Sequence, residues 1–381
     1  MKKLAYSLLK FGLKTFYGLA KEDRVILLSP NLSGSNTFAL YKNMIYSNVE
    51  TEFIISTKIK KFSYSKRFHF YKRIYKSKII VGTHGQIDFA TKNSMYIETW
   101  HGFPLKTMLL LDKGIDKKLS KKIQKKRSKA DYYISYSDFY NTVLNSTLGL
   151  HWSKYIITGY PRNDFLFYCN RKLLKKFHIN EYFKIIFYLP TFRKSIGGKG
   201  VTSAGKIFNP VANIPDIDLE SFCDFLEENS ITWLMKPHIL SADYSKNCSI
   251  SCKNIVLIAD NDLKHSYTDL YELLACADLL ITDYSSVYFD FLLLNKPIIF
   301  IPTDIEEYRK KRGFLLEPYD MWTPGPKVYT QKELQNEILK SLNDPSYYAE
   351  ERERLKNIVH YYQDANSSKR VWEFINSLIE G

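Results

Sequence analysis

The segment at residues 278–304 constrains the fold of this chain more than any other part of the sequence. It reads DLLITDYSSVYFDFLLLNKPIIFIPTD: a short apolar run, a turn rich in hydroxyl groups, an apolar helical stretch and a second apolar run. Short apolar runs such as Leu279, Leu280 and Ile281 are typical of parallel strands that are covered on both faces. The segment therefore predicts a strand, a helix and a strand of a parallel α/β sheet.

The turn inside this segment predicts a phosphate-binding site. Thr282, Asp283, Tyr284, Ser285 and Ser286 place capping-type side chains where the predicted helix begins. A helix N-terminus offers unpaired backbone N–H groups and a positive dipole end to an anion, and serine hydroxyls add further donors. The alternative is a plain serine N-cap without a ligand.

The same alternation of strands and helices continues through both halves of the chain. Strands are expected at 25–29, 52–56, 78–82, 95–99, 132–135, 155–158, 184–189, 232–236, 255–258, 279–282 and 298–301. Helices are expected at 37–47, 117–128, 139–147, 219–229, 267–277, 287–294 and 331–342. This order predicts an α/β fold with parallel sheets wound on both faces.

The length of the chain favours two domains, because 381 residues are more than a single hydrophobic core usually accommodates. The charged stretch at 167–182 separates the two arrays of strands and helices. We therefore predict doubly wound parallel-sheet domains at 22–170 and 171–381, with the option that the C-terminal helices pack back on the first domain.

Residues 1–21 predict an amphipathic helix. Lys3, Lys10, Lys14 and Lys21 fall on one side of such a helix and leucines occupy the other. This pattern suits a helix that lies in the interface of an anionic membrane. A helix packed on its own domain is the alternative. A signal peptide fits less well, since the lysines interrupt the apolar core and no small-residue cleavage site follows.

The formal net charge of +15 implies a negatively charged partner. Two basic tracts, at 58–78 and 113–129, are expected to be largely exposed to solvent. We expect an anionic membrane surface and a lipid diphosphate to meet these charges. Nucleic acid is the alternative, but no helix-turn-helix, zinc-finger or RRM pattern accompanies the tracts.

The remaining composition bears on compartment and cofactors. An odd number of cysteines, five, without paired C-x-x-C motifs predicts a reduced, cytosolic compartment. No apolar run of about 18 residues is present to span a bilayer. No cluster of metal ligands can be recognised, so we expect no metal site and no cofactor, while a requirement for a divalent ion stays open.

Four further motifs accompany the opening segment: ETWHGFPLKTM at 98–108, TGYPRNDFL at 158–166, LPTFR at 189–193 and MKPH at 235–238. In this order the five motifs resemble the CDP-glycerol glycerophosphotransferase family, the teichoic acid primases and polymerases. The resemblance extends from about Arg24 to the C-terminus. It implies a GT-B-like architecture, in which two such domains face each other across a cleft.

Two histidines are the candidate catalytic residues. His101 and His238 each follow a predicted strand, in opposite halves, beside Gly or Pro. Ligands of such folds bind beyond the carboxyl ends of the strands. A lone histidine at a strand end is commonly structural, but the matched placement favours function. The resemblance implies that His101 is the general base and His238 a diphosphate ligand, and the reverse assignment stays open.

Other side chains are candidates for binding. Those expected to bind the donor or its phosphates are Arg193, Lys236, Thr282, Asp283, Ser285 and Ser286. Those expected on the acceptor side, or in support, are Gly102, Lys106, Arg162, Asp164 and Thr191. For Arg193, the alternative is an ion pair with a carboxylate such as Asp164.

By resemblance, the expected reaction transfers glycerol phosphate from CDP-glycerol to a hydroxyl of a membrane-bound acceptor, with release of CMP. The expected acceptor is an undecaprenyl-diphosphate-linked saccharide or a polyol phosphate, met at the cytoplasmic face of the plasma membrane by a peripheral protein. Three alternatives stay open: a CDP-ribitol ribitolphosphotransferase, a GT-B glycosyltransferase that uses a nucleotide sugar, and a non-catalytic basic binder of membranes or nucleic acid.

Overall fold

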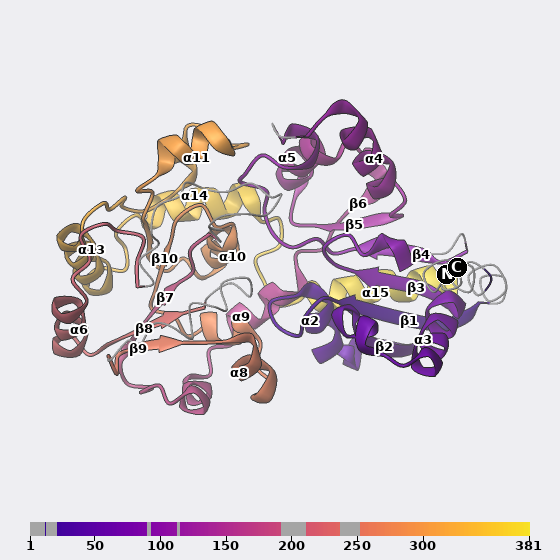
Figure 1. Cartoon of the computed structure of the whole chain (residues 1–381), viewed down its shortest axis with the longest axis horizontal. Helices are drawn as coiled ribbons and strands as arrows, with labels where there is room; N and C mark the ends of the chain where they lie inside the picture. Colours follow the sequence, from indigo (N-terminus) through magenta and orange to yellow (C-terminus); the bar gives the residue numbers. More distant parts are fainter. Residues whose placement is uncertain (1–11, 13–20, 90–92, 113–114, 192–210, 237–251) are drawn as a thin grey trace. The chain divides into compact units, whose positions relative to one another are not determined.

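The chain folds into two compact units, each built around one parallel sheet (Figure 1). The structure is a computed structural model that describes residue 12 and residues 21–89, 93–112, 115–191, 211–236 and 252–381. Unit 1 comprises residues 1–101, 117–164 and 361–381, and unit 2 comprises 102–116 and 165–360. The predicted boundary at residue 170 differs from this division, because residues 102–116 belong to unit 2 and residues 361–381 belong to unit 1.

The sheet of unit 1 has the strand order β2-β1-β3-β4-β5-β6, and every neighbouring pair is parallel. The chain moves outward from β1 to β2 and then returns past β1 to β3. The direction of winding therefore reverses between β1 and β3, the place where ligands bind in open α/β sheets. The strands are β1 (Glu22–Ser29), β2 (Glu50–Ile55), β3 (Ser77–Gly82), β4 (Met95–Glu98), β5 (Tyr132–Ser135) and β6 (Tyr155–Ile157).

The helices of unit 1 include one from the far end of the chain. Helix α15 contacts α2, and Trp372 Nε1 donates to Leu40 O at 3.1 Å. Val371, Trp372 and Ile375 recur at helical spacing and are fully buried, which explains why this C-terminal helix packs here. The helices are α2 (Asn36–Lys42), α3 (Tyr64–Lys76), α4 (Lys117–Arg127), α5 (Asp138–Leu148) and α15 (Ser367–Glu380).

The sheet of unit 2 has the order β11-β10-β7-β8-β9, again all parallel. Its winding reverses between β7 and β10. Trp233 of β8 is fully buried and packs edge-on against Phe222 of α6 at 5.1 Å between ring centroids. The strands are β7 (Lys184–Tyr188), β8 (Ile231–Met235), β9 (Ile255–Leu257), β10 (Leu279–Thr282) and β11 (Ile298–Phe300).

Short helices connect and cover this second sheet, and longer ones follow it near the end of the chain. They are α6 (Leu219–Glu228), α8 (Asp260–His265), α9 (Leu270–Leu274), α10 (Val287–Phe291), α11 (Ile305–Lys311), α12 (Tyr319–Trp322), α13 (Gln331–Asn343) and α14 (Ala349–Val359).

The predicted α/β fold with parallel sheets is confirmed, and each predicted strand is present within a few residues. The helix predicted at 287–294 is shorter than expected: α10 has five residues and a 3₁₀ turn, Leu292–Leu294, follows it. Six of the described helices were not predicted: α3, α8, α11, α12, α14 and α15. A cleft between the two domains stays a prediction.

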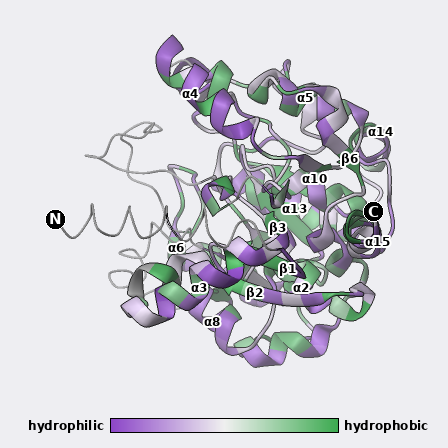
Figure 2. Ribbon diagram, turned by 90° about the vertical axis from the view of Figure 1, so that its right-hand side faces the viewer, coloured by the Kyte–Doolittle hydropathy of each residue, from purple (hydrophilic) through white to green (hydrophobic). Residues whose placement is uncertain are grey.

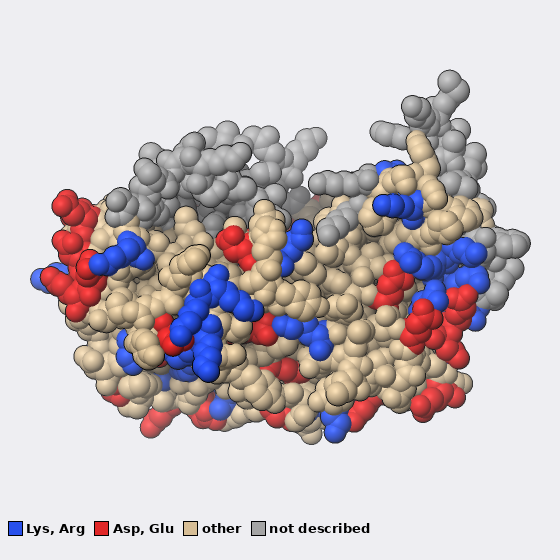
Figure 3. Space-filling view, turned by 90° about the horizontal axis from the view of Figure 1, so that it is seen from below, with Lys and Arg blue, Asp and Glu red and all other residues tan. Residues whose placement is uncertain are grey.

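The prediction that the basic tract at 58–78 is largely exposed is wrong for the residues whose side chains the structure describes, because many of them are buried or half-buried. Helix α3 buries Phe70, Tyr71, Ile74 and Tyr75 against the sheet of unit 1. Carboxylates also neutralise part of its charge, as in the ion pair of Lys76 with Glu22 at 2.6 Å. Basic and acidic side chains lie side by side on the face shown in Figure 3.

Helix α4, in the second basic tract, behaves as expected. It buries none of its residues and is largely hydrophilic in Figure 2. The predicted N-terminal helix lies outside the described residues, apart from Gly12 and Lys21. Lys21 does not extend a membrane-facing stripe, because its Nζ donates to Tyr75 O at 2.6 Å and Ser94 Oγ at 2.7 Å. Among the described helices, none is long and apolar enough to cross a membrane.

Candidate active site

The turns that follow β3 and β4 bring two histidines together in unit 1. The two strands are parallel neighbours with Gly82 opposite Glu98, so the residues after them leave the sheet side by side. The ring of His101 lies on the ring of His84, with centroids 4.7 Å apart and planes 13° from parallel. Trp100 contacts the same ring at 4.6 Å. His101 thus contacts two aromatic neighbours at the carboxyl edge of the sheet.

A buried carboxylate joins these two turns. Glu98 Oε2 accepts from Gly85 N at 2.9 Å, and Glu98 Oε1 accepts from Trp100 N at 3.0 Å. Burial raises the pKa of Glu98 to about 7, while the charge of Arg127 and these N–H donors oppose the rise. One side chain therefore fixes the backbone on both sides of the stacked rings.

The backbone of this site is strained. His84 and Trp100 have φ of 58° and 51°, in the left-handed region that costs energy for residues other than glycine. Glycine suits position 85, because its φ is 71° and an added Cβ would lie 1.4 Å from Arg127 Nη1 and displace that side chain. Strained residues persist where the surrounding structure holds them, and they gather at functional sites.

Sequence reasoning did not identify His84 as a site residue. The signal was present, because His84 and Gly85 follow a strand just as His101 and Gly102 do. The expectation of a functional histidine at a strand end therefore applied equally to His84.

Arg162 lies in the segment after β6 and contacts the loop that follows β1. Its side chain is buried, Nη1 donates to Gly34 O at 3.1 Å, and its guanidinium lies 5.6 Å from the centre of the Tyr160 ring. The backbone N–H of Arg162 donates to Asn36 Oδ1 at 3.3 Å. Arg162 thus places a positive charge beside the point where the winding of the first sheet reverses.

Asp164 has a supporting role. Its two carboxylate oxygens accept from Ser367 N at 2.8 Å and Ser368 N at 2.7 Å, the first residues of α15. A carboxylate at a helix start satisfies orphan N–H groups and interacts favourably with the helix dipole. Burial nevertheless raises the pKa of Asp164. The residue joins the TGYPRNDFL motif to the C-terminal helix.

In unit 2, Asp283 occupies the place where the second sheet reverses its winding. Asp283 Oδ1 accepts from Thr191 N at 2.7 Å and from Tyr284 N at 2.5 Å, and so joins the turns after β7 and β10. Thr282 Oγ1 donates to Leu189 O at 2.7 Å, which commits that hydroxyl proton to the same junction. These three predicted residues, Thr191, Thr282 and Asp283, are all buried.

Ser285 and Ser286 remain half-buried at the start of α10. Ser286 is the N-cap residue, but its side chain makes no capping hydrogen bond. The hydroxyl is therefore not used in the way that the plain capping alternative requires. Because α10 is so short, its dipole adds little, and the two hydroxyls with the nearby backbone N–H groups are the available donors.

The remaining predicted site residues do not join either of these two clusters in the described part of the chain. Lys236 Nζ pairs with Asp260 Oδ1 at 2.8 Å, at the start of α8. Gly102, with φ of 141°, and Lys106, which bridges to Phe314, belong to unit 2, although His101 belongs to unit 1. Arg193 and His238 lie outside the described residues, so their predicted roles stay predictions.

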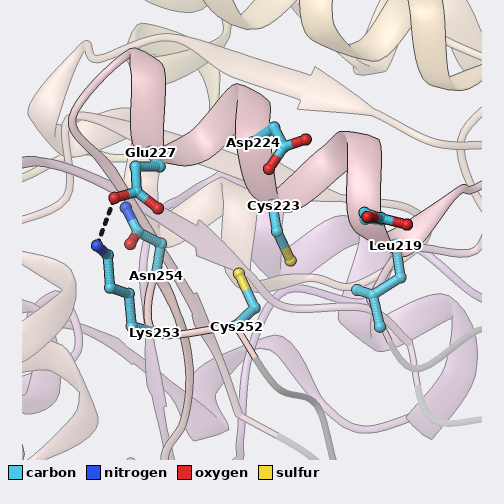
Figure 4. A pocket seen from close by; sticks show the side chains of 8 residues that line it. Leu219, Cys223, Asp224, Glu227, Cys252, Lys253 and Asn254 are labelled. Carbon is cyan, nitrogen blue, oxygen red and sulfur yellow. Dashed lines mark hydrogen bonds and ion pairs between the residues drawn. The ribbon is translucent and has the colours of Figure 1, made fainter.

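None of the described site residues lines a cavity of about 580 Å³ in unit 2 (Figure 4). Its wall is formed by α6 and by the residues just before β9, at the amino ends of the strands. The thiols of Cys223 and Cys252 point toward each other in it. The described residues include no group of three or more His, Cys, Asp or Glu that is placed to hold a metal ion.

Comparison with known proteins now identifies the family. A family model described as CDP-Glycerol:Poly(glycerophosphate) glycerophosphotransferase matches residues 13–377. The chain belongs to this family. The resemblance seen in the five sequence motifs is therefore confirmed, and with it the general class of glycerophosphotransferases.

Curated glycerophosphotransferases match most of the chain. A teichoic acid poly(glycerol phosphate) polymerase of Bacillus spizizenii is 33% identical over 304 residues, 74% of this chain and 70% of that protein. A Bacillus subtilis polymerase is 32% identical over 271 residues, 67% of this chain but only 33% of its own length. The Staphylococcus aureus teichoic acid glycerol-phosphate transferase is 27% identical over 75% of this chain and 72% of its own.

A solved glycerophosphotransferase shares the fold. The wall teichoic acid polymerase TagF matches with a TM-score of 0.77 at 22% identity, over 100% of this chain and 96% of that chain. At this level of identity the likeness establishes the fold and leaves the roles of individual side chains to be argued from the geometry described above.

Proposed function

We propose that this protein transfers glycerol phosphate from CDP-glycerol to a hydroxyl of a lipid-linked acceptor and releases CMP. The observation that carries the proposal is the placement of His101, in contact with two aromatic rings at the carboxyl edge of a sheet, in a chain of the glycerophosphotransferase family. Relatives named as glycerol-phosphate transferases and polymerases, and a TagF variant solved with CDPG, support CDP-glycerol as the donor.

The reaction needs a base and stabilisation of charge. The acceptor hydroxyl oxygen attacks the phosphorus that carries glycerol, a P–O bond to the acceptor forms, and the P–O bond to CMP breaks as CMP leaves in line. The hydroxyl proton passes to a base. Positioning and electrostatic stabilisation of the phosphoryl oxygens supply most of the acceleration.

We assign the base to His101, because a neutral imidazole accepts a proton near pH 7. We assign the donor diphosphate to His238 and Arg193, with the hydroxyls of Ser285 and Ser286 as further donors. Lys236 has a secondary role in this scheme, since its ammonium is already paired with Asp260. Glu98 and Asp283 hold the backbone of their respective turns.

We also propose that the protein works as a peripheral protein at the cytoplasmic face of the membrane, where a lipid-linked saccharide is available. The exposed basic helix α4 and the net charge of +15 support attraction to anionic lipid. The relatives include both a glycerol-phosphate primase and poly(glycerol phosphate) polymerases, so the proposal covers transfer of one glycerol phosphate as well as of many.

CDP-ribitol is a second candidate donor. A ribitol-phosphate primase of Bacillus spizizenii is 30% identical over 227 residues, 58% of this chain. The test is to incubate the full chain and a lipid-linked acceptor separately with CDP-glycerol, CDP-ribitol and UDP-sugars, and to follow nucleotide release. CMP from CDP-glycerol alone is expected, and release of UDP without CMP would contradict the proposal.

A further inference from the structure

We propose that His84 is a positioning residue for His101 and that it acts by stacking against the imidazole ring. The inference rests on the proposed function, in which His101 is the general base. No contact between His84 and a substrate is invoked.

The position of His84 in the fold is the first support. His84 follows β3, next to the point where the first sheet reverses its winding, and β4, which carries His101, is its parallel neighbour. Ring centroids 4.7 Å apart with planes 13° from parallel show that the two rings are stacked, and this contact restricts rotation of the His101 ring about its side-chain bonds.

The second support is the hydrogen bonding that orients the His84 ring. The hydroxyl of Thr83 donates its only proton to Trp100 O, so its oxygen can act only as an acceptor toward His84. His84 Nδ1 lies 3.1 Å from that oxygen. We therefore assign the proton of the neutral ring to Nδ1. The ring orientation is thereby tied to the backbone of Trp100, the residue that precedes His101.

Electrostatics allow this stacking during the reaction. His84 is exposed to solvent on one side, while desolvation by the surrounding protein, followed by the charges of Arg162 and Arg127, lowers its pKa below the ordinary value. Glu98 is the carboxylate that ties down the same two turns. At pH 7 His84 is neutral, so it does not repel the imidazolium that forms when His101 accepts a proton.

The backbone at His84 guides the choice of test variants. Its φ of 58° lies in the left-handed region, where His and Asn are among the residues other than glycine that occur most often. An Asn at this position should therefore keep the backbone and remove the ring.

The test compares two substitutions that separate the backbone from the ring. His84→Asn tolerates the left-handed backbone and removes the ring, whereas His84→Phe keeps a ring and removes the nitrogens. We expect His84→Asn to lower kcat by about 10- to 100-fold, because small misplacements of a reacting group have effects of this size. KM for the CDP-activated donor and the melting temperature should change little. His84→Phe should retain kcat within about 3-fold of wild type, since its ring still stacks.

His101→Ala in the full chain is the control that distinguishes failure of the stacking role of His84 from failure of the proposed function. If His101→Ala is inactive and His84→Asn keeps wild-type kcat, the inference is wrong and the proposed function stands. If His101→Ala is fully active, the base assignment itself fails. Loss of activity in both folded His84 variants would show that a ring nitrogen is needed and would overturn the stacking role. His84→Gly provides a second ringless variant should the Asn variant not fold.

Discussion

At the carboxyl edge of each sheet a buried carboxylate holds two turns in place, but the side chains beyond it differ between the two units. In unit 1, Glu98 accepts from the backbone N–H groups of two turns, and in unit 2 Asp283 does the same. Beyond Glu98 lie stacked imidazoles on left-handed backbone, whereas beyond Asp283 lie serine hydroxyls. The comparison teaches that one buried carboxylate suffices to fix such a turn. Under the proposed function, the side chains beyond it serve proton transfer at one edge and anion binding at the other.

The largest expected effect separates these two tasks. His101→Ala should lower kcat by about 10² to 10⁴, as loss of a general base typically does, and should leave binding of CDP unchanged. His238→Ala should lower activity and also weaken CDP binding, measured by isothermal titration calorimetry. Equal loss of CDP binding in both variants would contradict the separation of tasks.

The next effect concerns pH. The folded pKa of Glu98 is about 7, above its ordinary value of 4.5, so the native state binds this proton more tightly than the unfolded state. Stability should therefore fall as pH rises from about 4.5 through 7, by at most about 3 kcal/mol. Urea unfolding at several pH values measures the slope. Glu98→Gln should remove this component, and an unchanged slope in that variant would refute the account.

Amide substitutions test directly whether the buried carboxylates hold the turns. Glu98→Gln and Asp283→Asn each replace an acceptor by an amide, which leaves a backbone N–H facing an N–H₂ group or unpaired. Asp283→Asn should lower the free energy of unfolding by about 1–3 kcal/mol at pH 7. Glu98→Gln should lower it by a similar amount at pH 4, where Glu98 is protonated and the cost of its ionisation does not offset the lost acceptor. Asp224→Asn, at an exposed position on α6, is the matched control and should change it little. If only one of the two variants is destabilised, the two carboxylates are not equivalent.

A smaller effect is expected at the anion-binding edge. The double variant Ser285→Ala, Ser286→Ala should weaken binding of CDP by about 1 kcal/mol per lost hydrogen bond, because the backbone donors remain. Ser377→Ala, at an exposed position on α15, is the control. Unchanged CDP affinity in the double variant would remove both serines from the donor site.

The smallest effect per residue concerns the membrane. Replacing Lys117, Lys118, Lys121 and Lys122 of α4 by Ala should weaken partition onto anionic vesicles by about 1 kcal/mol per lysine at most, and less at higher salt. The control removes the same charge from exposed lysines of unit 2: Lys172, Lys176, Lys264 and Lys310. Equal losses in a vesicle sedimentation assay would mean that net charge, rather than α4, determines attachment.

The sequence predicted the sheets well, because a buried parallel strand such as Leu279–Thr282 leaves a continuous apolar run whatever its neighbours are. It located His101 and Asp283 for a related reason, since polar residues directly after such runs must lie at one edge. It did not indicate which polar residues meet there. His84 shares no periodic pattern with His101, and only the pairing of β3 with β4 brings the two rings together.

The sequence also could not predict roles that depend on partners far away along the chain. Asp164 binds the start of a helix about two hundred residues further along the chain. Lys21 looked like a membrane-facing lysine because its partners, Tyr75 and Ser94, are brought to it only by the fold. The length of α10 was overestimated, since the apolar run 291–294 continues past Phe291 while the backbone changes to a 3₁₀ turn.

The most direct test of the central claim is to follow both products of one reaction. The full chain is incubated with CDP-glycerol labelled in the glycerol and with a lipid-linked saccharide, and CMP and labelled lipid are measured together. The account predicts equal amounts of CMP and transferred glycerol phosphate in the wild type, and loss of both in folded His101→Ala. CMP release that continues unchanged in His101→Ala, or release without label on the acceptor, would contradict it.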